Sequence, residues 1–314
     1  MKDSLVSSKG VVLTVNDLHD MWLELIKVTG LNVIGLHGEI EHIIRFINSE
    51  YGIYFLEQLN KNHVAIEYEI HAMSYLLPRS EFDEHPEWFR MDEKGIRTPD
   101  GNLCPSSKEA LEIVCSNALC LSELLTPATN RYYLWADDAK SWCRCKKCST
   151  LSASDQNLLV MNEIIRQLRR KQPDALLAYL AYLDTLEPPK AVKPDEGIFL
   201  EFAPIQRRYD ARLDDKNVPE NARHIEKLEA LINIFGTKGA QVLEYWLDSS
   251  MFSKWTKPAK QIPFNKELFK ADLLLYINKG IAYIKTFGVY LDNDYFSKYG
   301  TKEVLEYGMT LKEY

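Results

Sequence analysis

The sequence contains no long apolar run and no block of like charge. Its 314 residues carry a net charge of −7, and no stretch of five or six residues of one sign occurs. No apolar run approaches the ~20 residues that a membrane-spanning helix needs, and residues 1–10 lack the hydrophobic segment of a signal peptide. We therefore expect no membrane or nucleic-acid partner and a cytoplasmic location for the chain as given. A longer native chain would leave a secreted or periplasmic location open.

Nothing in the composition indicates disorder or a fibrous protein. The chain is 46% hydrophobic and 26% charged, which is ordinary for a globular protein with a sizeable core. Its length allows one domain or two, since α/β barrels reach ~250 residues as one unit. We find no internal repeat, low-complexity tract or linker, and therefore expect one domain over residues 1–314.

Short β-rich apolar runs alternate with helical patterns along the chain. This alternation indicates βα units, which build a parallel sheet, and eight such runs predict a (β/α)8 TIM barrel of the α/β class. The predicted strands are Val11–Val15, Asn32–His37, Val64–Met73, Arg131–Ala136, Leu176–Leu183, Gly197–Ala203, Gln241–Leu247 and Ile284–Leu291. The predicted helices are Leu18–Val28, Ile40–Leu59, Lys108–Leu125, Asp155–Arg170, Ala222–Phe235, Lys266–Asn278 and a short piece from Lys302. The Pro-rich connection of residues 184–196 is too short for a normal helix.

Three predicted strands carry polar side chains on one face, and we expect these faces to point into the barrel. A purely structural barrel is filled with Val, Ile and Leu, so polar inward faces favour an active site. The faces are those of Glu67, Glu69 and His71 in the third strand, Glu244 and Trp246 in the seventh, and Thr286, Gly288 and Tyr290 in the eighth.

The segment Trp135-Ala136-Asp137-Asp138 lies at the end of the fourth strand, where barrel enzymes place catalytic groups. Adjacent carboxylates beside an aromatic ring suit glycoside hydrolysis. One group must hold a proton for the leaving oxygen, and another must stabilise the oxocarbenium-like centre. A pair of aspartates can also simply cap the following loop, but the barrel context favours catalysis.

Two longer segments resemble a known family. After the strand-end aspartate come Trp-Cys-x-Cys-x-x-Cys at residues 142–148 and Ser-Ala-Ser-Asp-Gln at residues 152–156. The preceding loop contains His-Pro-Glu-Trp-Phe at residues 85–89, then Gly95, Arg97 and Leu-Cys-Pro-Ser at residues 103–106. These motifs resemble the bacterial family labelled domain of unknown function 4838. That family is distantly similar to barrel glycosidases of the β-N-acetylhexosaminidase, O-GlcNAcase and α-glucuronidase types.

The resemblance implies a glycosidase that acts on a hexosamine or uronic-acid glycoside and needs no cofactor for catalysis. In the hexosaminidase and O-GlcNAcase types a carboxylate pair ends strand four, which makes Asp138 the general acid and Asp137 the group that polarises an acetamido substituent. The family commonly has one acidic residue followed by glycine where this chain has Asp137, Asp138 and Ala139. The pattern therefore supports Asp138 only, and Glu244 is an alternative second carboxylate.

Cys143, Cys145 and Cys148 are close enough in sequence to bind one Zn²⁺. A closed tetrahedral site needs a fourth ligand, for which Cys104 is the first candidate and His85 the second. Such a zinc would be structural, bracing the loop beside the aspartate pair. Reduced surface thiols, or a disulfide in an exported protein, are the alternatives.

Aromatic rings near strand ends can stack on sugar rings through their apolar faces, although most such rings belong to the core. Trp246 and Tyr290 share a face with polar neighbours and are stronger candidates than Trp142, Tyr182 or Trp255. The predicted substrate-binding residues are His37, Glu39, His71, Trp135, Glu201, Tyr245, Trp246, Tyr290 and Asp292.

Two other functions are compatible with the sequence. A carbohydrate-binding barrel without catalysis would hold sugar and release no aglycone. A metal-dependent hydrolase could use His37, His71 and Glu201, but no His-x-His or Glu-x-x-His pair stands at a strand end to support it.

Overall fold

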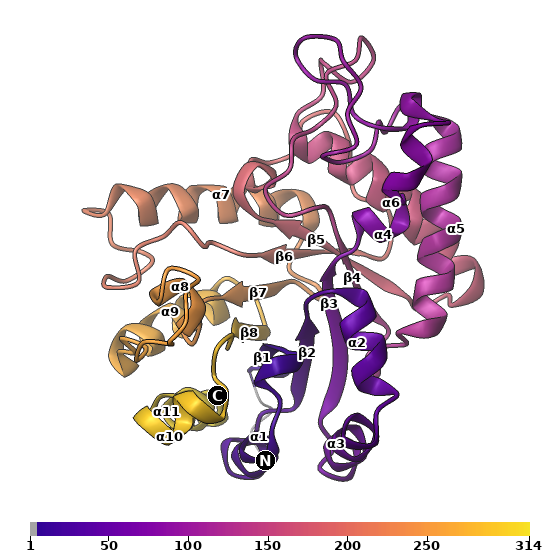
Figure 1. The fold of residues 1–314 in the computed structure, drawn as a ribbon. Helices are drawn as coiled ribbons and strands as arrows, with labels where there is room; N and C mark the ends of the chain where they lie inside the picture. Colours follow the sequence, from indigo (N-terminus) through magenta and orange to yellow (C-terminus); the bar gives the residue numbers. More distant parts are fainter. Residues whose placement is uncertain (1–4) are drawn as a thin grey trace.

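The chain folds into a closed barrel of eight parallel strands (Figure 1). The computed structural model describes residues 5–314, so residues 1–4 of the predicted domain lie outside it. Neighbouring strands pair in sequence order and β8 closes against β1, which confirms the predicted (β/α)8 fold. The strands are β1 (Ser8–Thr14), β2 (Val33–His37), β3 (Ala65–His71), β4 (Arg131–Trp135), β5 (Leu176–Ala181), β6 (Ile198–Phe202), β7 (Gln241–Glu244) and β8 (Tyr283–Phe287).

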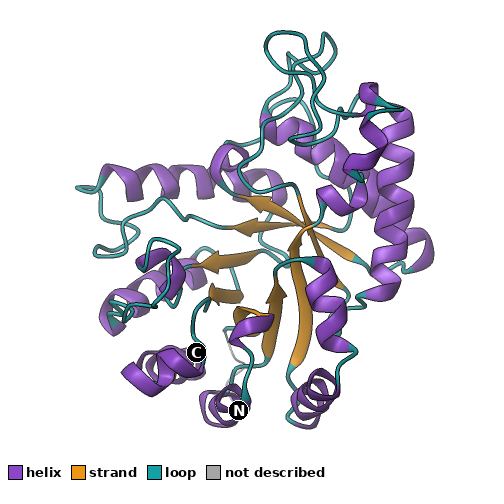
Figure 2. Ribbon diagram, in the orientation of Figure 1, coloured by secondary structure: helices purple, strands orange, loops and turns teal. Residues whose placement is uncertain are grey.

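Helices surround the strands, as Figure 2 shows in purple around the orange barrel. Most lie where the sequence predicts them. The main helices are α1 (Asp20–Thr29), α2 (Ile40–Ile47), α3 (Glu50–Lys61), α5 (Lys108–Leu124), α6 (Ala153–Lys171), α7 (Pro219–Phe235), α9 (Lys266–Asn278), α10 (Asn293–Tyr299) and α11 (Lys302–Lys312). Shorter turns are η1 (Val15–Asp17), α4 (Met73–Leu76), η2 (Arg79–Phe82), η3 (Pro86–Trp88), η4 (Leu183–Leu186) and α8 (Ser249–Phe252). Within residues 5–314 no helix is long and apolar enough to cross a membrane.

The predicted helix Ile40–Leu59 is in fact two helices. Ser49 caps α3 by accepting a hydrogen bond from the N–H of Gly52 at 3.0 Å. Gly52 approaches α2 so closely that a Cβ there would lie 1.8 Å from the carbonyl oxygen of Phe46. Apolar residues continue at helical spacing across the break, so periodicity alone did not reveal the turn.

The inward faces agree with the prediction in β3 and differ in β7 and β8. Glu67 and Glu69 of β3 point into the barrel, where both contact Lys285 of β8. Because Lys285 points inward, the adjacent Thr286 faces the helices. The same inversion applies to β7, where Leu243 is inward. Both faces of these two strands carry polar residues, so polarity did not identify the inward one.

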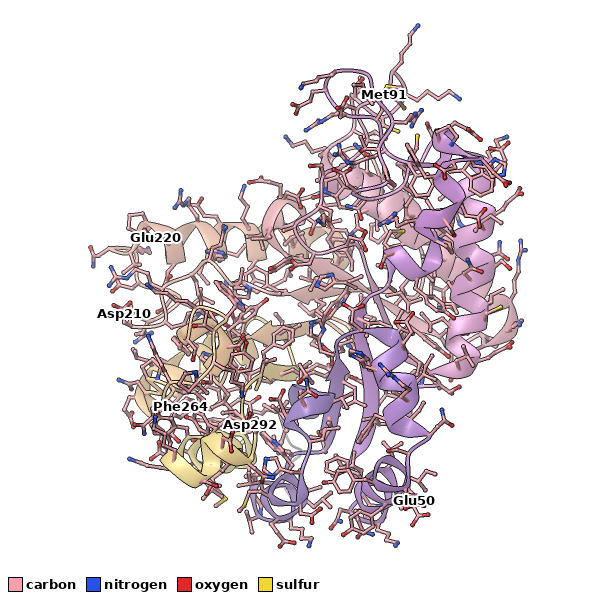
Figure 3. All side chains as sticks on the ribbon, in the orientation of Figure 1. Glu50, Met91, Asp210, Glu220, Phe264 and Asp292 are labelled. Atoms are coloured by element: carbon pink, nitrogen blue, oxygen red, sulfur yellow. The ribbon has the colours of Figure 1, made fainter. Side chains whose placement is uncertain are left out.

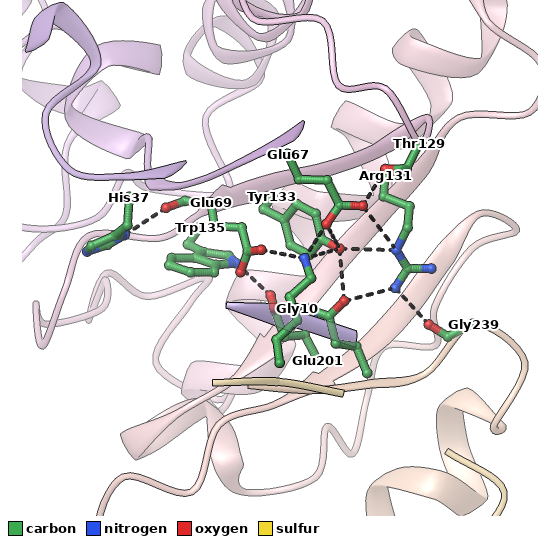
Figure 4. A network of polar contacts seen from close by, with 12 residues as sticks. Gly10, His37, Glu67, Glu69, Thr129, Arg131, Tyr133, Trp135, Glu201 and Gly239 are labelled. Atoms are coloured by element: carbon green, nitrogen blue, oxygen red, sulfur yellow. Dashed lines mark hydrogen bonds and ion pairs between the residues drawn. The ribbon is translucent and has the colours of Figure 1, made fainter. Parts of the chain in front are cut away.

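A layer of buried charges fills the barrel below the strand ends (Figure 4). Lys285 donates hydrogen bonds to Glu67 and Glu69, and its ammonium lies 3.1 Å from the Tyr133 hydroxyl. Arg131 donates to the same hydroxyl at 3.1 Å. All of these side chains are buried, so each charge relies on its partners rather than on water.

Burial and charge have opposing effects on the pKa values in this layer. Burial lowers the pKa of Lys285, but the charges of Glu67 and Glu69 outweigh it and hold the pKa well above its ordinary value. Burial also opposes ionisation of Glu67, yet Lys285 and Arg131 lower its pKa. Burial raises the pKa of Glu69 to about 7 and raises that of Glu201 well above its ordinary value. Burial thus opposes a further negative charge on Glu201 inside the barrel.

Two glycines make room for these side chains. A Cβ at Gly10 would lie 2.8 Å from Cγ of Lys285, and a Cβ at Gly35 would lie 2.5 Å from Oε1 of Glu69. Both distances are shorter than van der Waals contact, so a larger residue at either position would displace the ion pair.

The longest loops leave the carboxyl ends of the strands. Residues 72–107 connect β3 to α5, and residues 245–265 connect β7 to α9. The first of these projects beyond the barrel at the top of the view in Figure 1, and Met91, labelled in Figure 3, lies in the projecting part. The barrel thus presents its longest loops at the end where enzymes of this fold place their sites.

We expect Lys285→Met to lower the free energy of unfolding by about 3–5 kcal/mol, because it leaves two buried carboxylates without their cation. Denaturant unfolding measures the loss. The matched control is Lys27→Met, which removes an exposed ion pair with Glu24 and should cost less than about 1 kcal/mol. Equal stabilities of the two variants would contradict this account of the charged layer.

Candidate active site

Three adjoining hollows lie at the carboxyl ends of the strands. The inner hollow has a volume of about 250 Å³, the outer hollow about 740 Å³ and the side hollow about 800 Å³. His37 lines all three, so they form one cleft. The inner hollow is lined by Thr14, His37, His71, Trp135, Asp138, Leu180, Tyr182, Ile205, Leu243, Tyr245, Asp248, Ser250, Trp255, Phe287 and Val289.

Aromatic rings form much of the wall of the inner hollow. Tyr245 and Phe287 stack with their centroids 5.3 Å apart. Trp135 is fixed from below, because its indole N–H donates to Glu201 at 2.8 Å. Trp135 and Tyr245 therefore line the cleft, whereas Glu201 is buried in the charged layer and does not reach it. The prediction that Glu201 contacts a ligand fails because the tryptophan covers it.

His37 and His71 lie side by side in the cleft, with ring centroids 5.8 Å apart. Nδ1 of His37 lies 2.7 Å from the carbonyl oxygen of Glu69, and Nδ1 of His71 lies 2.5 Å from that of Ala136. A carbonyl oxygen only accepts, so both Nδ1 atoms donate. Burial and the neighbouring His71 lower the pKa of His37 to about 4, which leaves His37 uncharged at neutral pH.

Asp138 lies where the inner and outer hollows meet, since it lines both. Its side chain is exposed. The Tyr182 hydroxyl donates a hydrogen bond to it, and burial together with the charge of Asp138 raises the pKa of Tyr182. The next residue, Ala139, has a φ of +50°, in the left-handed region that favours glycine. The turn that presents Asp138 thus holds an alanine in a conformation that glycine adopts more readily.

Asp137 is held by the loop after β3. One carboxylate oxygen pairs with Arg79, and the other accepts a hydrogen bond from the N–H of Ser74 at 3.1 Å. The N–H of Asp137 donates to Asn102 at 3.1 Å. Asp137 lines the outer hollow and not the inner one. These bonds fasten the loop after β4 to the loop after β3.

The other carboxylate of the inner hollow belongs to Asp248, which the sequence analysis missed. It follows β7 and caps α8, accepting hydrogen bonds from the N–H and the hydroxyl of Ser250 at 3.0 and 2.6 Å. Burial raises its pKa to about 6 despite these bonds. An aspartate followed by two serines just past a strand end is a helix-capping pattern, and that signal marks the position in the sequence.

Glu244 and Trp246, predicted at the opening, lie behind the barrel wall. Glu244 is fully buried, lies 3.3 Å from Arg207 and accepts a hydrogen bond from Tyr276 at 2.6 Å. Trp246 packs against Phe269 with ring centroids 4.8 Å apart. Their predicted position was wrong because the alternate residues of β7 face inward, and neither side chain reaches the cleft.

The remaining predicted residues line the outer and side hollows. Glu39 lines both, and Tyr290 and Asp292 line the side hollow. Asp292, labelled in Figure 3, forms an ion pair with Lys257, whose ammonium lies 4.4 Å from the centre of the Tyr290 ring. Tyr290 has a φ of +70°, which is unusual for a bulky residue. Such backbone strain is found preferentially at functional sites.

Trp255 is the most exposed aromatic ring of the inner hollow. It is 64% exposed and has a φ of +55°. An exposed indole at the mouth of a hollow offers an apolar face to a ligand ring. The sequence analysis ranked Trp255 below Trp246, and the structure reverses that order.

Cys104, Cys143, Cys145 and Cys148 form one buried cluster beside the outer hollow. All are free thiols, and their sulfur atoms lie within 4.8 Å of one another. Cys104 Sγ lies 3.7 Å from that of Cys145 and 3.9 Å from that of Cys148. A tetrahedral site with Zn–S bonds of ~2.3 Å requires sulfur separations of about 3.8 Å. The cluster therefore fits a metal ion, with Cys104 as its fourth member.

His85 takes no part in this cluster, because its ring stacks on Trp88 with centroids 3.9 Å apart. Hydrogen-bond donors face the sulfur of Cys143 instead, namely the N–H of Met91 at 3.3 Å and the guanidinium of Arg97 at 3.7 Å. Such donors stabilise metal-bound thiolates.

Within the part of the chain that the structure describes, the four cysteines are the one group of His, Cys, Asp and Glu side chains whose ligand atoms converge. His37, His71 and Glu201 do not converge in this way. The geometry thus gives no support to a metal-dependent hydrolase built on those three residues.

Several solved structures share the fold. The cellulose synthase subunit Z (CcsZ) of Clostridioides difficile matches with a TM-score of 0.50 at 10% identity, over 96% of this chain and 99% of its own. A glycoside hydrolase family 20 β-N-acetylglucosaminidase matches at 0.50 and 9% identity, over 98% and 69%. The family 36 α-galactosidase AgaA of Geobacillus stearothermophilus matches at 0.51 and 10% identity, over 98% and 42%. At these identities the similarity shows the fold alone.

No curated protein sequence matches this chain. The family model described as a domain of unknown function (DUF4838) matches residues 42–271. That segment is well over half of the chain and runs from α2 into α9, so it includes Asp138 and the four clustered cysteines. The chain therefore belongs to the DUF4838 family.

Proposed function

We propose that this protein hydrolyses glycosides in the cleft at the carboxyl ends of its strands. The observation that carries the proposal is the position of Asp138, which lines both the inner and the outer hollow. A glycoside with its sugar ring in the inner hollow and its leaving group in the outer one would hold the glycosidic oxygen beside Asp138. That position suits the proton donor.

Asp248 is the second carboxylate of this proposal. It lines only the inner hollow, where the reacting sugar would lie, and Tyr182 lies within range of the charge of both aspartates. Glycosidases of both stereochemical types use two carboxylates that flank the scissile bond. Asp248 takes this role in place of Glu244, whose carboxylate is turned toward the helices.

Asp137 is a positioning residue in the same proposal. Its two oxygens are engaged by Arg79 and by the N–H of Ser74, and it does not line the inner hollow. A direct contact between Asp137 and an acetamido group of the reacting sugar is therefore not included. Its bonds hold the turn from which Asp138 reaches the junction of the two hollows.

The substrate class is a hexosamine or uronic-acid glycoside. One enzyme that shares the fold is a β-N-acetylglucosaminidase, which is compatible with a hexosamine. The aromatic wall of Trp135, Tyr245 and Phe287, with the exposed Trp255 at the mouth, supports binding of a sugar ring.

We also propose that the four-cysteine cluster binds one structural Zn²⁺. The sulfur separations and the thiolate-directed donors support this assignment. Four protein ligands leave no open coordination position, so such an ion would brace the loops after β3 and β4 without entering the reaction. Both loops also line the outer hollow through Asp100 and Lys140.

Replacing Asp138 with Asn should lower kcat by ~10²–10⁴ for aryl glycosides with poor leaving groups, and much less for good ones, which need little protonation. KM should change little, because Asn keeps the size and most hydrogen bonds of the bound state. Steady-state kinetics on a leaving-group series measures this. Asp210→Asn, at an exposed aspartate outside the three hollows (Figure 3), is the matched control.

An Asp138→Asn variant that cleaves a poor-leaving-group substrate at the parent rate would remove Asp138 from the mechanism. If the parent binds sugar and cleaves nothing, the protein is a carbohydrate-binding barrel.

The pH dependence of kcat/KM should show an acid limb near pH 6. Burial raises the pKa of Asp248 to about 6, so the carboxylate is ionised above that pH and gains a proton below it. Activity should fall as the pH falls through 6, because protonation removes the second carboxylate. Measuring kcat/KM on both sides of pH 6 tests the assignment. A rate that rises as the pH falls through 6 would instead make Asp248 the proton donor.

Metal analysis of protein prepared without added zinc should find close to one equivalent of zinc per chain. Cys145→Ser should remove most of it and lower the melting temperature, whereas Cys120→Ser, at an exposed cysteine outside the cluster, should do neither. A disulfide among the clustered cysteines in reduced protein, or a zinc content unaffected by Cys145→Ser, would refute the zinc site.

A further inference from the structure

Neither Lys nor Arg lines the inner hollow. Two carboxylates line it, those of Asp138 and Asp248, and neither Lys nor Arg is among its lining residues. His37 is uncharged at neutral pH, and its Nδ1–H donates to the carbonyl oxygen of Glu69, so its Nε2 is an acceptor. The hollow therefore offers a ligand two carboxyl groups and the His37 acceptor, and neither Lys nor Arg.

The cations of the adjoining hollows do not line the inner hollow, and two of them are paired with aspartates. Arg79 lines the outer hollow and pairs with Asp137. Lys257 lines the side hollow and pairs with Asp292. Lys285 and Arg131 belong to the buried layer, where they pair with Glu67 and Glu69 of β3. Lys140 also lines the outer hollow and does not line the inner one.

We infer that the inner hollow selects an uncharged sugar ring and rejects a uronic acid. The inference rests on the proposed function and narrows its substrate class to the hexosamine side. Hydroxyl groups of a neutral ring can donate hydrogen bonds to Nε2 of His37 and to the two aspartates. A uronate carboxylate would lose its hydration beside two other carboxyl groups, and no Lys or Arg lines the hollow to replace the water.

The discrimination has two separable causes, which the structure assigns to different residues. The Nε2 acceptor of His37 favours a ring with hydroxyl donors. The carboxylate of Asp248, which is ionised above about pH 6, disfavours a second carboxylate, and so does Asp138 whenever it has given up its proton. Removing one aspartate charge should therefore improve binding of a uronate while leaving a neutral sugar nearly unaffected.

The experiment compares N-acetylglucosamine, glucose and glucuronate as ligands for the whole protein at neutral pH. Calorimetry or the fluorescence of the tryptophans at the hollow reports binding without turnover, so the comparison does not depend on catalysis. We expect a neutral sugar to bind at least about tenfold more tightly than glucuronate, since sites with unmatched buried polar groups discriminate strongly.

Asp138→Asn and Asp248→Asn should each raise the affinity for glucuronate and so lower the ratio of neutral-sugar affinity to glucuronate affinity. The control variant Asp210→Asn should leave that ratio unchanged. Circular dichroism shows whether each variant is folded.

Glucuronate binding as tight as the binding of neutral sugars would overturn the inference and leave the proposed glycosidase standing. If Asp138→Asn and Asp248→Asn leave the ratio of neutral-sugar affinity to glucuronate affinity unchanged, the proposed electrostatic cause of the selectivity is overturned. Failure of every sugar to bind would overturn both the inference and the proposed function.

Discussion

The ion pairs of Lys285 with Glu67 and Glu69 are the constraint on which the barrel and its cleft depend. A buried ammonium is tolerated only where carboxylates surround it, and this requirement fixes which residues of β3 and β8 face inward. It also explains why β1 and β2 carry Gly10 and Gly35 at the points where the Lys285 and Glu69 side chains need space. One electrostatic requirement therefore sets the register of side chains across four neighbouring strands.

The charged layer also holds the floor of the cleft in place. Glu69 offers its carbonyl oxygen to His37, and Glu201 accepts the indole N–H of Trp135. Because these bonds come from the barrel itself, the imidazole and the indole are positioned by strands rather than by flexible loops, which favours a preorganised site. The two aspartates of the inner hollow are on loops, but each loop has its own restraint. The pairing of Asp137 with Arg79 holds one, and the capping of α8 by Asp248 holds the other.

Local patterns in the sequence were sufficient for the fold and for part of the site. Strand and helix periodicities identify all eight strands, and Cys-x-Cys-x-x-Cys with Cys104 identifies a cluster that closes in space. The inward faces of β7 and β8 were not predictable in this way. Glu244 is polar yet faces the helices, because Arg207 and Tyr276, far away in sequence, satisfy its carboxylate there. The sequence analysis missed Asp248 and ranked Trp255 below Trp246 for a related reason. They lie on a long loop whose return to the cleft is decided by tertiary packing rather than by residue spacing.

The charge balance inside the barrel determines what a ligand experiences above it. In a low-dielectric interior, an uncompensated charge below Trp135 would act strongly on a ligand above that ring. The cations Lys285 and Arg131 face the glutamates of β3 at close range, and burial opposes a further negative charge on Glu201. The layer is thus close to neutral as a whole. The aspartates on the wall of the inner hollow, rather than the more numerous charges beneath, are then the charged groups that act most directly on a ligand there.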